Sequence, residues 1–372
     1  MLKILFILTG LNYAGAENQV VQLCRGFRAR GHQALVVSMV EPEAYLEELG
    51  ELGVEVRSLG MAKGVPDPRG ILRLRQIIKE FGPDVVHSHL VHANILARIT
   101  RLFVKMPVLI CTAHNVNEGG KLREWLYRMT DPLCELTTNV SEEAVRQYVE
   151  RKVVPRHKIK FMPNGITLGS FGQGCDKEWL ADELGIAADS FVWLAVGRLV
   201  PEKDYPNLFA AFTAVLKQYP GSVLLVAGTG SERPALEKQC CELGIEDQVK
   251  LLGLRKDIPA LMRFADAYVM SSQWEGFPMV LLEASASGLP MVVTDVGGNR
   301  EAVLDGVSGM LVPPEDSQQL SRRMMEMMSL STVELAAMGE QARKYVSERF
   351  DMEVIVTQWT RIYELKGISP GV

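Results

Sequence analysis

Residues 2–40 contain the stretch that decides the fold class of this chain, LKILFILTG (2–10), ENQVVQLCRGFRARG (17–31) and QALVVSMV (33–40). The first and last segments are near-continuous runs of Val, Ile, Leu and Phe, as in strands that are covered on both faces. The segment between them predicts a helix that ends at Gly31. Strands that alternate with helices in this way predict a parallel sheet with helices on both faces.

This alternation continues through the first half of the chain and gives way at FMPNGITLGSFGQG (161–174) to a linker composition rich in Gly, Pro, Asn and Ser. It restarts at FVWLAVGRL (191–199) and continues to MVVTDV (291–296). We therefore expect an α/β protein with two doubly wound, Rossmann-like halves. The expected parts are an N-terminal domain, a C-terminal domain and a last helix that packs back on the N-terminal domain: 1–165, 166–350 and 351–372.

The composition is that of a globular protein of two domains. The 372 residues exceed one ordinary core, and 47% of them are hydrophobic and 23% charged. No apolar run reaches the roughly 18–20 residues that a membrane-spanning helix requires. We interpret MLKILFILTG (1–10) as a buried first strand and not as a signal peptide. The six cysteines form no CxxC pair, so we expect incidental thiols in a cytoplasmic protein.

The charge is distributed unevenly along a chain whose net charge is −5. Residues 1–170 carry 22 Lys and Arg against 17 Asp and Glu, and the remainder carries 18 against 28. A basic half beside an acidic half suggests that the two halves meet different partners. Because no long basic stripe or reader motif is present, nucleic acid is not an expected partner.

Two cations follow one strand end in the second half. In GRLVPEKD (197–204) the strand runs into Gly197, and Arg198 and Lys203 come after it. Ligands of open parallel sheets collect at the carboxyl ends of the strands. An Arg fork and a Lys point charge on such a loop suit a diphosphate. We therefore predict a diphosphate site here, against the alternative of two solvated surface cations.

A second glycine-bearing strand end, VAGTGSE (226–232), is less informative by itself. It lacks the full spacing of a dinucleotide fingerprint, and the chain contains no GxxxxGK[ST]. A hydride carrier and a nucleoside-triphosphatase loop are therefore not indicated.

EGFPMVLLE (275–283) places two acids around a tight turn. Gly276 permits close backbone approach to a ligand, and Pro278 is expected as the first residue of a helix. The amides of Gly276 and Phe277 would then point from the helix N-terminus toward an anion. Glu283, one to two turns into the helix, could accept both hydroxyls of a ribose, and Glu275 could hold a sugar ring. The alternative is that both acids are cap or surface carboxylates, which the composite pattern disfavours.

Together these motifs resemble family-4 retaining glycosyltransferases of the GT-B fold. The resemblance covers nearly the whole chain and includes further motifs in the same order: MPNGI (162–166), GLPMVVTDVGGNREAV (288–303) and DGVSGMLVPPED (305–316). LNYAGAENQV (11–20) is similar to the GGxE loop of the family, with Ala14 in place of the first glycine, and ICTAHNVNE (110–118) is similar to its His-bearing strand end. The GT-B fold implies two Rossmann-like domains that face each other across a cleft.

The resemblance implies that a nucleotide-sugar donor binds mainly to the C-terminal domain. By carry-over, Arg198 and Lys203 hold the donor diphosphate and Glu283 holds the ribose. Glu275 orients the donor sugar, and backbone from Gly253 to Arg255 frames the base. The strand-end glycine before the two cations belongs to the same donor site.

The resemblance places the acceptor on the N-terminal domain. The amide of Gly15 would approach the distal phosphate of the donor, and His114 would reach the sugar from this side. A lone His in an apolar segment is more often structural. His114 ends the strand VLICTAH (108–114) and is followed by Asn115, so we favour a functional role.

The family meets the diphosphate charge with protein cations and amides, so the resemblance implies neither a metal nor another cofactor. The sequence agrees, because no DxD-like acidic pair stands beside a strand end. Transfer is expected to retain the anomeric configuration through a same-face attack, with the leaving phosphate accepting the acceptor's proton. Domain closure is expected to expel water. The residues expected to act in catalysis are His114, Arg198, Lys203 and Glu275.

Three histidines in HSHLVHAN (87–94) have the look of a metal cluster. No Cys or acid pattern completes a zinc site, so we favour the alternative that they line the acceptor cleft.

Three segments of the first half are basic and have apolar faces. Such helices can lie on anionic lipid, although ordinary surface helices have the same pattern. Because many members of the family build lipid-linked saccharides, we expect a saccharide or lipid-linked saccharide acceptor and a peripheral position on the inner face of the membrane. The basic residues concerned are Arg69, Arg73, Arg75, Lys79, Arg98, Arg101, Lys105, Lys121, Arg123 and Arg128.

Two other classes stay open beside a glycosyltransferase of polysaccharide synthesis. One is a sugar-nucleotide epimerase of the same architecture, and the other is a non-catalytic sugar-nucleotide-binding subunit. For the donor we favour a UDP-sugar, with N-acetylhexosamine as the sugar, over a GDP-sugar.

Overall fold

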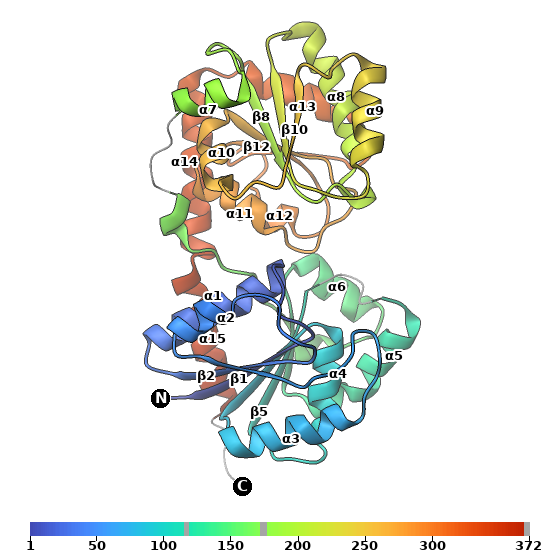
Figure 1. Cartoon of the computed structure of the whole chain (residues 1–372), viewed down its shortest axis with the longest axis vertical. Helices are drawn as coiled ribbons and strands as arrows, with labels where there is room; N and C mark the ends of the chain where they lie inside the picture. Colours follow the sequence, from blue (N-terminus) through green and yellow to red (C-terminus); the bar gives the residue numbers. More distant parts are fainter. Residues whose placement is uncertain (115–118, 172–176, 368–372) are drawn as a thin grey trace. The chain divides into compact units, whose positions relative to one another are not determined.

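A computed structural model describes residues 1–114, 119–171 and 177–367 (Figure 1). The chain forms two compact units. Unit 1 comprises Met1–Gly165 and Asp351–Val372, and unit 2 comprises Ile166–Phe350.

Unit 1 is built on a seven-stranded sheet in the order β3-β2-β1-β4-β5-β6-β7, in which all neighbouring strands are parallel. The strands are β1 (Lys3–Leu8), β2 (Gln33–Ser38), β3 (Glu55–Ser58), β4 (Val85–His89), β5 (Val108–Ala113), β6 (Leu136–Asn139) and β7 (Ile159–Phe161). The helices are α1 (Gly15–Ala29), α2 (Leu46–Glu51), α3 (Arg69–Phe81), α4 (Val91–Thr100), α5 (Lys121–Thr130), α6 (Glu142–Glu150) and α15 (Met352–Gly367), with the 3₁₀ turns η1 (Asp131–Leu133) and η2 (Arg156–Lys158).

The first strand shows why its sequence is apolar throughout. Alternate residues of a strand point to opposite faces of the sheet. Ile4 and Phe6 belong to the core cluster that contains α1, whereas Leu5 and Ile7 belong to the cluster on α3 and α4. Both faces of β1 are therefore buried, as the uninterrupted apolar run predicts.

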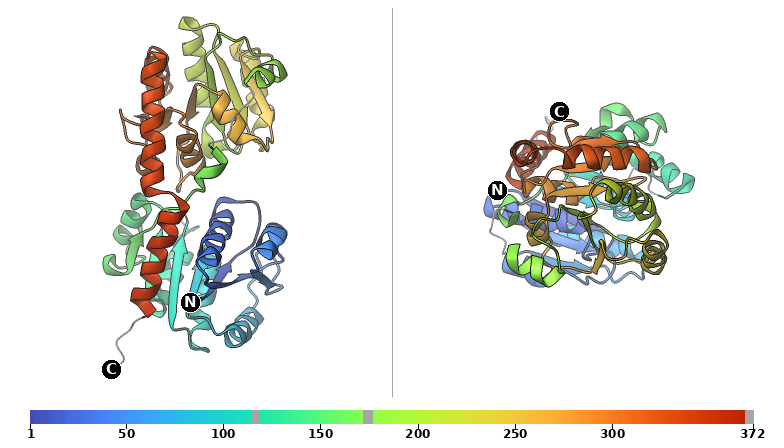
Figure 2. Two further views of the ribbon diagram at one scale, coloured as in Figure 1. Left: turned by 90° about the vertical axis from the view of Figure 1, so that its left-hand side faces the viewer. Right: turned by 90° about the horizontal axis from the view of Figure 1, so that it is seen from above.

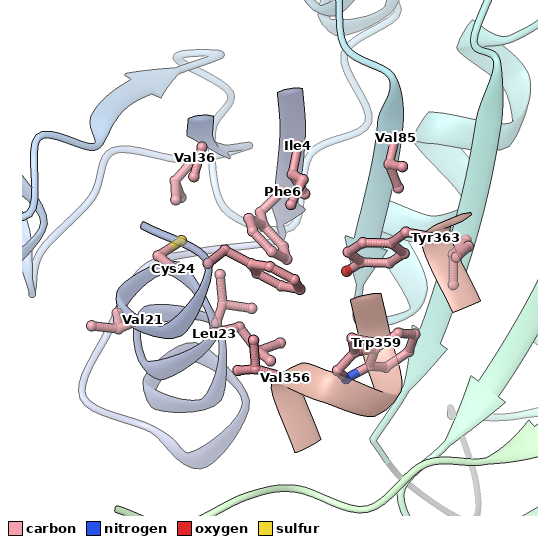
Figure 3. Close-up of a cluster of buried hydrophobic side chains, with 14 of the residues drawn as sticks. Ile4, Phe6, Val21, Leu23, Cys24, Val36, Val85, Val356, Trp359 and Tyr363 are labelled. Carbon is pink, nitrogen blue, oxygen red and sulfur yellow. The ribbon is translucent and has the colours of Figure 1, made fainter. Parts of the chain in front are cut away.

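The C-terminal helix α15 completes the core of unit 1. Figure 2 shows it beside the sheet of unit 1, whereas α14, which precedes it, runs along unit 2. Val356, Trp359 and Tyr363 of α15 point toward Phe6 of β1 and Leu23 of α1 (Figure 3). Burial of each such side chain contributes roughly 1.5–3 kcal/mol, so α15 is part of the fold of unit 1 and not an appendage.

Gly165, in the MPNGI motif, lies against the start of α15. A Cβ atom at this position would lie 2.9 Å from side-chain atoms of Met352 and Ile355. The amide of Gly165 also donates to the Gln19 side chain at 3.0 Å. The glycine of this motif therefore lets the connecting segment approach the helix closely.

Unit 2 repeats the architecture with a six-stranded parallel sheet in the order β10-β9-β8-β11-β12-β13. The strands are β8 (Val192–Val196), β9 (Val223–Ala227), β10 (Val249–Gly253), β11 (Ala267–Met270), β12 (Met291–Thr294) and β13 (Met310–Val312). The helices are α7 (Lys177–Leu184), α8 (Tyr205–Gln218), α9 (Arg233–Leu243), α10 (Ile258–Phe264), α11 (Met279–Ala286), α12 (Asn299–Ala302), α13 (Ser317–Met328) and α14 (Thr332–Arg349), with the 3₁₀ turns η3 (Leu168–Phe171) and η4 (Pro201–Lys203). The strand order reverses between β8 and β11, the place where ligands of such sheets collect.

Not all the basic residues expected on the surface of unit 1 lie there. Arg98 of α4 is fully buried; its guanidinium stacks 4.1 Å from the Tyr127 ring centroid and donates to Thr137 Oγ1 at 2.7 Å. Its assignment to a lipid-facing stripe is therefore wrong, because partners for the guanidinium come from α5 and β6. Arg101 is paired with Glu135 at 2.5 Å. Within the three described ranges, no helix has the length and apolar character needed to cross a membrane.

Candidate functional site

The carboxyl end of β8 carries the two predicted cations of unit 2. The strand stops at Val196, and the amide of Gly197 continues its pairing by donating to Ala227 at 3.0 Å. The carbonyl of Arg198 accepts from the Val200 amide at 3.0 Å, whereas its side chain is exposed and forms no hydrogen bond or ion pair with any described residue. Lys203 ends η4 and returns to the strand end, where a Cβ atom on Gly197 would lie 3.4 Å from its Cε atom. One cation is therefore free to meet a ligand, and the other is held at the sheet edge.

The VAGTGSE segment supports this edge through backbone contacts. Gly228 has φ +153°, and a Cβ atom there would lie 1.8 Å from the carbonyl oxygen of Gly197. At Gly230 the corresponding distance, to the carbonyl oxygen of Leu199, is 2.1 Å. Real Cβ atoms do not come this close, so only glycine permits the two loops to touch. The GxG of this segment is therefore explained by packing against the neighbouring loop.

Lys203 and Glu275 form an ion pair at the ends of β8 and β11. Lys203 Nζ lies 2.5 Å from Glu275 Oε1, and the two side chains are 18% and 12% exposed. Ser272 Oγ donates to the same carboxylate oxygen at 2.7 Å, and Ser271 Oγ donates to the Lys203 carbonyl at 2.9 Å. The structure therefore brings together Lys203, which is predicted to bind the diphosphate, and Glu275, which is predicted to bind the sugar. It adds Ser272, which the sequence did not single out.

The turn after Glu275 is held by the glycines of the VTDVGGN segment. Gly297 has φ +51°, and a Cβ atom there would lie 1.9 Å from the Glu275 carbonyl oxygen. The amide of Gly298 donates to the carbonyl of Gly276 at 2.8 Å. Two loops separated by about 20 residues thus support each other through their backbones, and Gly276 stays half-buried at the edge.

The helix that follows begins one residue later than expected. Pro278 occupies the N-cap position, and α11 starts at Met279, so the prediction of Pro278 as the first helical residue is wrong by one position. The N-cap offers no side-chain hydrogen bond to the first turn. The ring of Phe277 is 7% exposed and packs on Phe350, with the ring centroids 5.5 Å apart. Only backbone groups of this turn are therefore available to an anion.

Glu283 lies one turn into α11 and is mostly buried. No described residue donates a hydrogen bond to its carboxylate, and burial raises the pKa of the Glu283 carboxyl to about 7. A buried carboxylate without donors is costly to ionise. It is therefore prepared to accept hydrogen bonds from a ligand with hydroxyl groups.

Arg255 follows β10, but its side chain is already occupied. The guanidinium donates to Glu183 at 2.7 Å and to Asp257 at 2.6 Å, and these two carboxylates raise its pKa. The carbonyl of Gly253 accepts from the Gly228 amide at 2.8 Å, which joins this loop to the others at the same edge. Any contact of Arg255 with a base would therefore come from its backbone, as expected.

In unit 1, Gly15 is the first residue of α1 and is exposed. The preceding residue, Ala14, is an N-cap that offers no side-chain hydrogen bond to the first turn. Glu17, in the same turn, is only 7% exposed, and burial raises its pKa. The sequence did not single out Glu17, although an acid two residues after the loop glycine and on the apolar face of the helix is a detectable signal.

His114 follows β5 and is 9% exposed. Its Nε2 atom lies 3.0 Å from Nδ1 of His89, and burial lowers its pKa to about 4. Asn115, which entered the prediction for His114, lies outside the described residues. A neutral imidazole at a strand end can give or accept one hydrogen bond at its remaining nitrogen.

The other histidines of HSHLVHAN separate into two environments. His87 is fully buried, with Nδ1 2.6 Å from the Tyr363 hydroxyl and Nε2 2.7 Å from Thr112 Oγ1. The expectation that it lines an acceptor cleft is therefore wrong, because α15 covers it. His92, on α4, is exposed. Among the residues that the structure describes, no group of three or more His, Cys, Asp or Glu side chains is arranged to hold a metal.

Two family models together match most of the chain. The model described as Glycosyltransferase Family 4 matches residues 13–169, and the model described as Glycosyl transferases group 1 matches residues 176–345.

Relatives and solved structures are similar to this chain over most of its length. The chain is 30% identical to the putative glycosyltransferase EpsF of Bacillus subtilis over 312 residues, 79% of each chain. It is 28% identical over 264 residues, 68% of each chain, to an Escherichia coli protein named UDP-Gal:alpha-D-GlcNAc-diphosphoundecaprenol alpha-1,3-galactosyltransferase. The crystal structure of Anabaena HepE in complex with UDP superposes with a TM-score of 0.85 at 25% identity and covers 98% of this chain and 100% of HepE; the complex with UDP-glucose gives 0.84. The chain therefore belongs to the family-4 glycosyltransferases and has the GT-B fold.

Proposed function

We propose that this glycosyltransferase moves a hexose from a UDP-sugar to a saccharide or lipid-linked saccharide, with retention of configuration and without a metal ion. The single observation that carries the proposal is the edge of the unit 2 sheet. There the Arg198 and Glu283 side chains, which have no hydrogen-bond partner among the described residues, lie with the Lys203–Glu275 pair and an uncapped helix start after two neighbouring strands. Arg198, Lys203 and the helix start suit a diphosphate, Glu275 suits a sugar, and Glu283 suits a ribose.

The choice of UDP rests on the relatives. HepE was solved with UDP and with UDP-glucose, and the name of the Escherichia coli relative specifies UDP-Gal as donor. These are hexoses, so we propose UDP-hexose before the N-acetylhexosamine that the sequence favoured. A diphosphoundecaprenol-linked sugar is the acceptor in the name of the Escherichia coli relative, which supports a lipid-linked acceptor for this chain.

The proposed chemistry follows from charge. As the bond between the anomeric carbon and the nucleotide breaks, negative charge grows on the leaving oxygen and positive charge on the sugar. We propose that Arg198, Lys203 and the amides of Gly276 and Phe277 stabilise the negative charge, because preorganised donors act strongly in a partly desolvated site. The acceptor hydroxyl attacks the same face and passes its proton to the leaving phosphate. Glu275 orients the sugar and is not assigned as a nucleophile.

Unit 1 is proposed to bind the acceptor. Gly15, at the uncapped start of α1, is proposed to donate its amide to the distal phosphate. His114 is proposed to hydrogen-bond the donor sugar. Domain closure around the donor is proposed to exclude water during transfer.

A thermal-shift screen of the full chain against UDP, GDP and ADP, with and without EDTA, tests the donor and the metal proposals together. UDP at about 100 times its Kd should add about 2.7 kcal/mol of stability. We expect UDP alone to raise the unfolding midpoint, and EDTA to leave that shift unchanged. Stabilisation by GDP or ADP instead would overturn the UDP assignment, and a shift that EDTA abolishes would overturn metal independence.

Product analysis completes the test. With UDP-glucose or UDP-galactose and an undecaprenyl-diphosphate-linked sugar, we expect a new glycoside with the anomeric configuration of the donor, seen by NMR. An inverted product would overturn retention. An epimerised nucleotide sugar would indicate an epimerase, and binding without turnover would indicate a non-catalytic subunit.

We also propose that α5 contacts an anionic membrane surface. Leu122, Trp125 and Met129 are 70%, 53% and 59% exposed, and their spacing places them on one stripe of the helix. Lys121 and Arg128 are exposed beside this stripe. An amphipathic helix with basic residues flanking exposed apolar ones is the pattern of interfacial binding.

No carboxylate among the described residues neutralises the charge of Arg128. Arg128 donates to the backbone carbonyls of Lys152 and Arg151, at 2.6 and 2.8 Å, and not to a carboxylate. Flotation with vesicles of phosphatidylcholine and phosphatidylglycerol should recover the wild type at low salt. The Leu122→Ser/Trp125→Ser variant should stay unbound, and Val333→Ser, which changes an exposed apolar residue of α14, should float. Equal flotation of all three proteins would contradict a role for α5.

A further inference from the structure

A buried chain of side chains in unit 1 leads from the C-terminal helix to His114. The Tyr363 hydroxyl lies 2.6 Å from His87 Nδ1, and the His87 ring lies against the His89 ring, with the centroids 4.1 Å apart and the planes tilted by 37°. His89 Nδ1 then meets His114 Nε2 at 3.0 Å. His87 and His89 are 0% and 1% exposed. The position of each ring is therefore fixed by the next one.

The contact between His89 and His114 needs one proton between two nitrogens. Either His89 Nδ1 donates to His114 Nε2, or His114 Nε2 donates to His89 Nδ1. In a neutral imidazole one nitrogen carries the proton and the other accepts. The choice at this contact therefore decides which nitrogen of His114 carries its own proton.

The far nitrogen of His89 favours the first arrangement. His89 Nε2 is buried, and no described residue is a hydrogen-bond partner for it. If His114 were the donor, a neutral His89 would carry its proton on Nε2, as a buried N–H without an acceptor. Orphaned N–H groups are rarer in proteins than unfilled acceptors. Phe6, 6.0 Å from His89 between ring centroids, adds to the apolar surroundings.

Both rings are expected to be neutral. Burial, with the neighbouring histidines as a smaller cause, lowers the pKa of His89 well below its usual range, and burial lowers that of His114 to about 4. The charged or titratable groups that act on His89 are His87 and His114, and no carboxylate is among them.

We propose that His89 is a positioning residue that holds His114 in the tautomer with its proton on Nδ1. His114 then presents a hydrogen-bond donor, and not a base, to its ligand. The group that it meets must be an acceptor, such as a hydroxyl or ring oxygen of the donor sugar. This inference rests on the proposed role of His114 in sugar binding, but the tautomer itself can be measured without any sugar.

The direct test is NMR of the full chain labelled with ¹⁵N in its histidines. We expect the His114 Nδ1 shift to be of the protonated type and the Nε2 shift of the unprotonated type throughout pH 6–8, with His114→Gln used for assignment. His89→Phe should move His114 toward the Nε2-protonated form. A wild-type His114 that carries its proton on Nε2 would overturn the proposal.

Rescue separates positioning from packing. His89→Asn keeps an N–H donor near the place of Nδ1, whereas His89→Phe fills the space without one. UDP release from UDP-glucose or UDP-galactose should fall roughly tenfold to hundredfold in His89→Phe and recover in His89→Asn. UDP binding to all variants should stay unchanged, and His157→Phe, at an exposed position of η2, serves as the matched control. Equal losses in His89→Phe and His89→Asn with an unchanged tautomer would show a structural role only.

The two proposals fail separately. If His114→Gln leaves UDP release unaffected while the Nδ1 tautomer is observed, the sugar-binding role of His114 is wrong and the tautomer assignment stands. If His114→Gln is inactive and the tautomer is the opposite one, the role of His114 stands and the positioning by His89 is wrong.

Discussion

The ends of β8 and β11 in unit 2 carry basic and acidic side chains, whereas the ends of β4 and β5 in unit 1 carry imidazoles with lowered pKa values. The charged groups keep contact with solvent or with each other: Arg198 is exposed, and Lys203 is paired with Glu275. The histidines His89 and His114 are buried, and one hydrogen bond joins them. The site proposed to neutralise a diphosphate is the open one, and the site proposed to orient a sugar from unit 1 is the buried one.

The largest effect is expected from a change in the backbone contacts that support the strand ends of unit 2. Gly228→Ala places a Cβ atom 1.8 Å from the Gly197 carbonyl oxygen at φ +153°. Strain and overpacking together should cost about 3–5 kcal/mol, which is roughly 10 °C in the unfolding midpoint, measured by calorimetry. Gly221→Ala has no atom within 4 Å of the new Cβ and should leave the midpoint nearly unchanged. An equal loss in both variants would show that loop contact is not what requires Gly228.

Removal of one charge should act on the reaction more than on the fold. Lys203→Ala deletes a cation and leaves the Glu275 carboxylate with Ser272 as its one side-chain partner in the described part of the chain. We expect sugar transfer to fall roughly 10²–10³-fold, because a preorganised donor to the leaving group is lost. Lys217→Ala, an exposed residue of α8, is the control. Since the two side chains touch, the double variant Lys203→Ala/Glu275→Gln should lose less sugar-transfer activity than the two single effects combined predict. Additive losses would show that the pair acts as two independent groups.

Ionisation of the Glu283 carboxyl is expected to lower the stability of the fold and to strengthen the binding of UDP. Its pKa is raised to about 7 in the folded chain from an ordinary 4.5, so folding becomes less favourable as pH rises between these values. Glu283→Gln should therefore raise the unfolding midpoint above that of the wild type at pH 8, and match it at pH 4.5. UDP affinity, by calorimetry, should fall roughly tenfold at pH 8 because a charged acceptor is lost. Equal unfolding midpoints of the wild type and Glu283→Gln at pH 8 would show that burial of the ionised Glu283 carboxylate costs no stability.

A change beside the buried histidines of unit 1 should have a small effect on stability and no effect on the ligand site of unit 2. Tyr363→Phe removes the hydroxyl that lies 2.6 Å from His87 Nδ1 and should cost about 1–2 kcal/mol, seen as a lower unfolding midpoint. UDP binding, proposed for unit 2, should stay the same. Tyr13→Phe, whose ring is 82% exposed, should change neither property. A loss of UDP affinity in Tyr363→Phe would break the separation between the two units.

The fold was accessible from the sequence because its signal is local. Apolar runs such as that of β1 are buried on both faces, and alternation with helices is confirmed in both parallel sheets. The environment of His87 was not accessible in this way. Its cover comes from Tyr363, 276 residues away, and no local pattern distinguishes a strand-end His under a returning helix from one that faces a ligand.

The site was accessible only to the level of the sheet edge. The rule that ligands collect at carboxyl strand ends places Lys203 and Glu275 near each other, but not in a 2.5 Å pair. Capture of the Arg255 guanidinium by Glu183 depends on the packing of α7, which residue spacing does not report. The roles of these residues toward a donor stay predictions.

The return of α15 to unit 1 also sets an order of events during synthesis. Unit 2 is continuous and complete once Phe350 has been made, whereas unit 1, though begun first, lacks Val356, Trp359 and Tyr363 of its core until the end. Domains usually fold from the N-terminus while the chain emerges. In this protein the second unit can reach its native state before the first, and a nonsense mutation near the end of the gene would leave a folded unit 2 attached to an N-terminal sheet whose α1-side face has lost part of its cover.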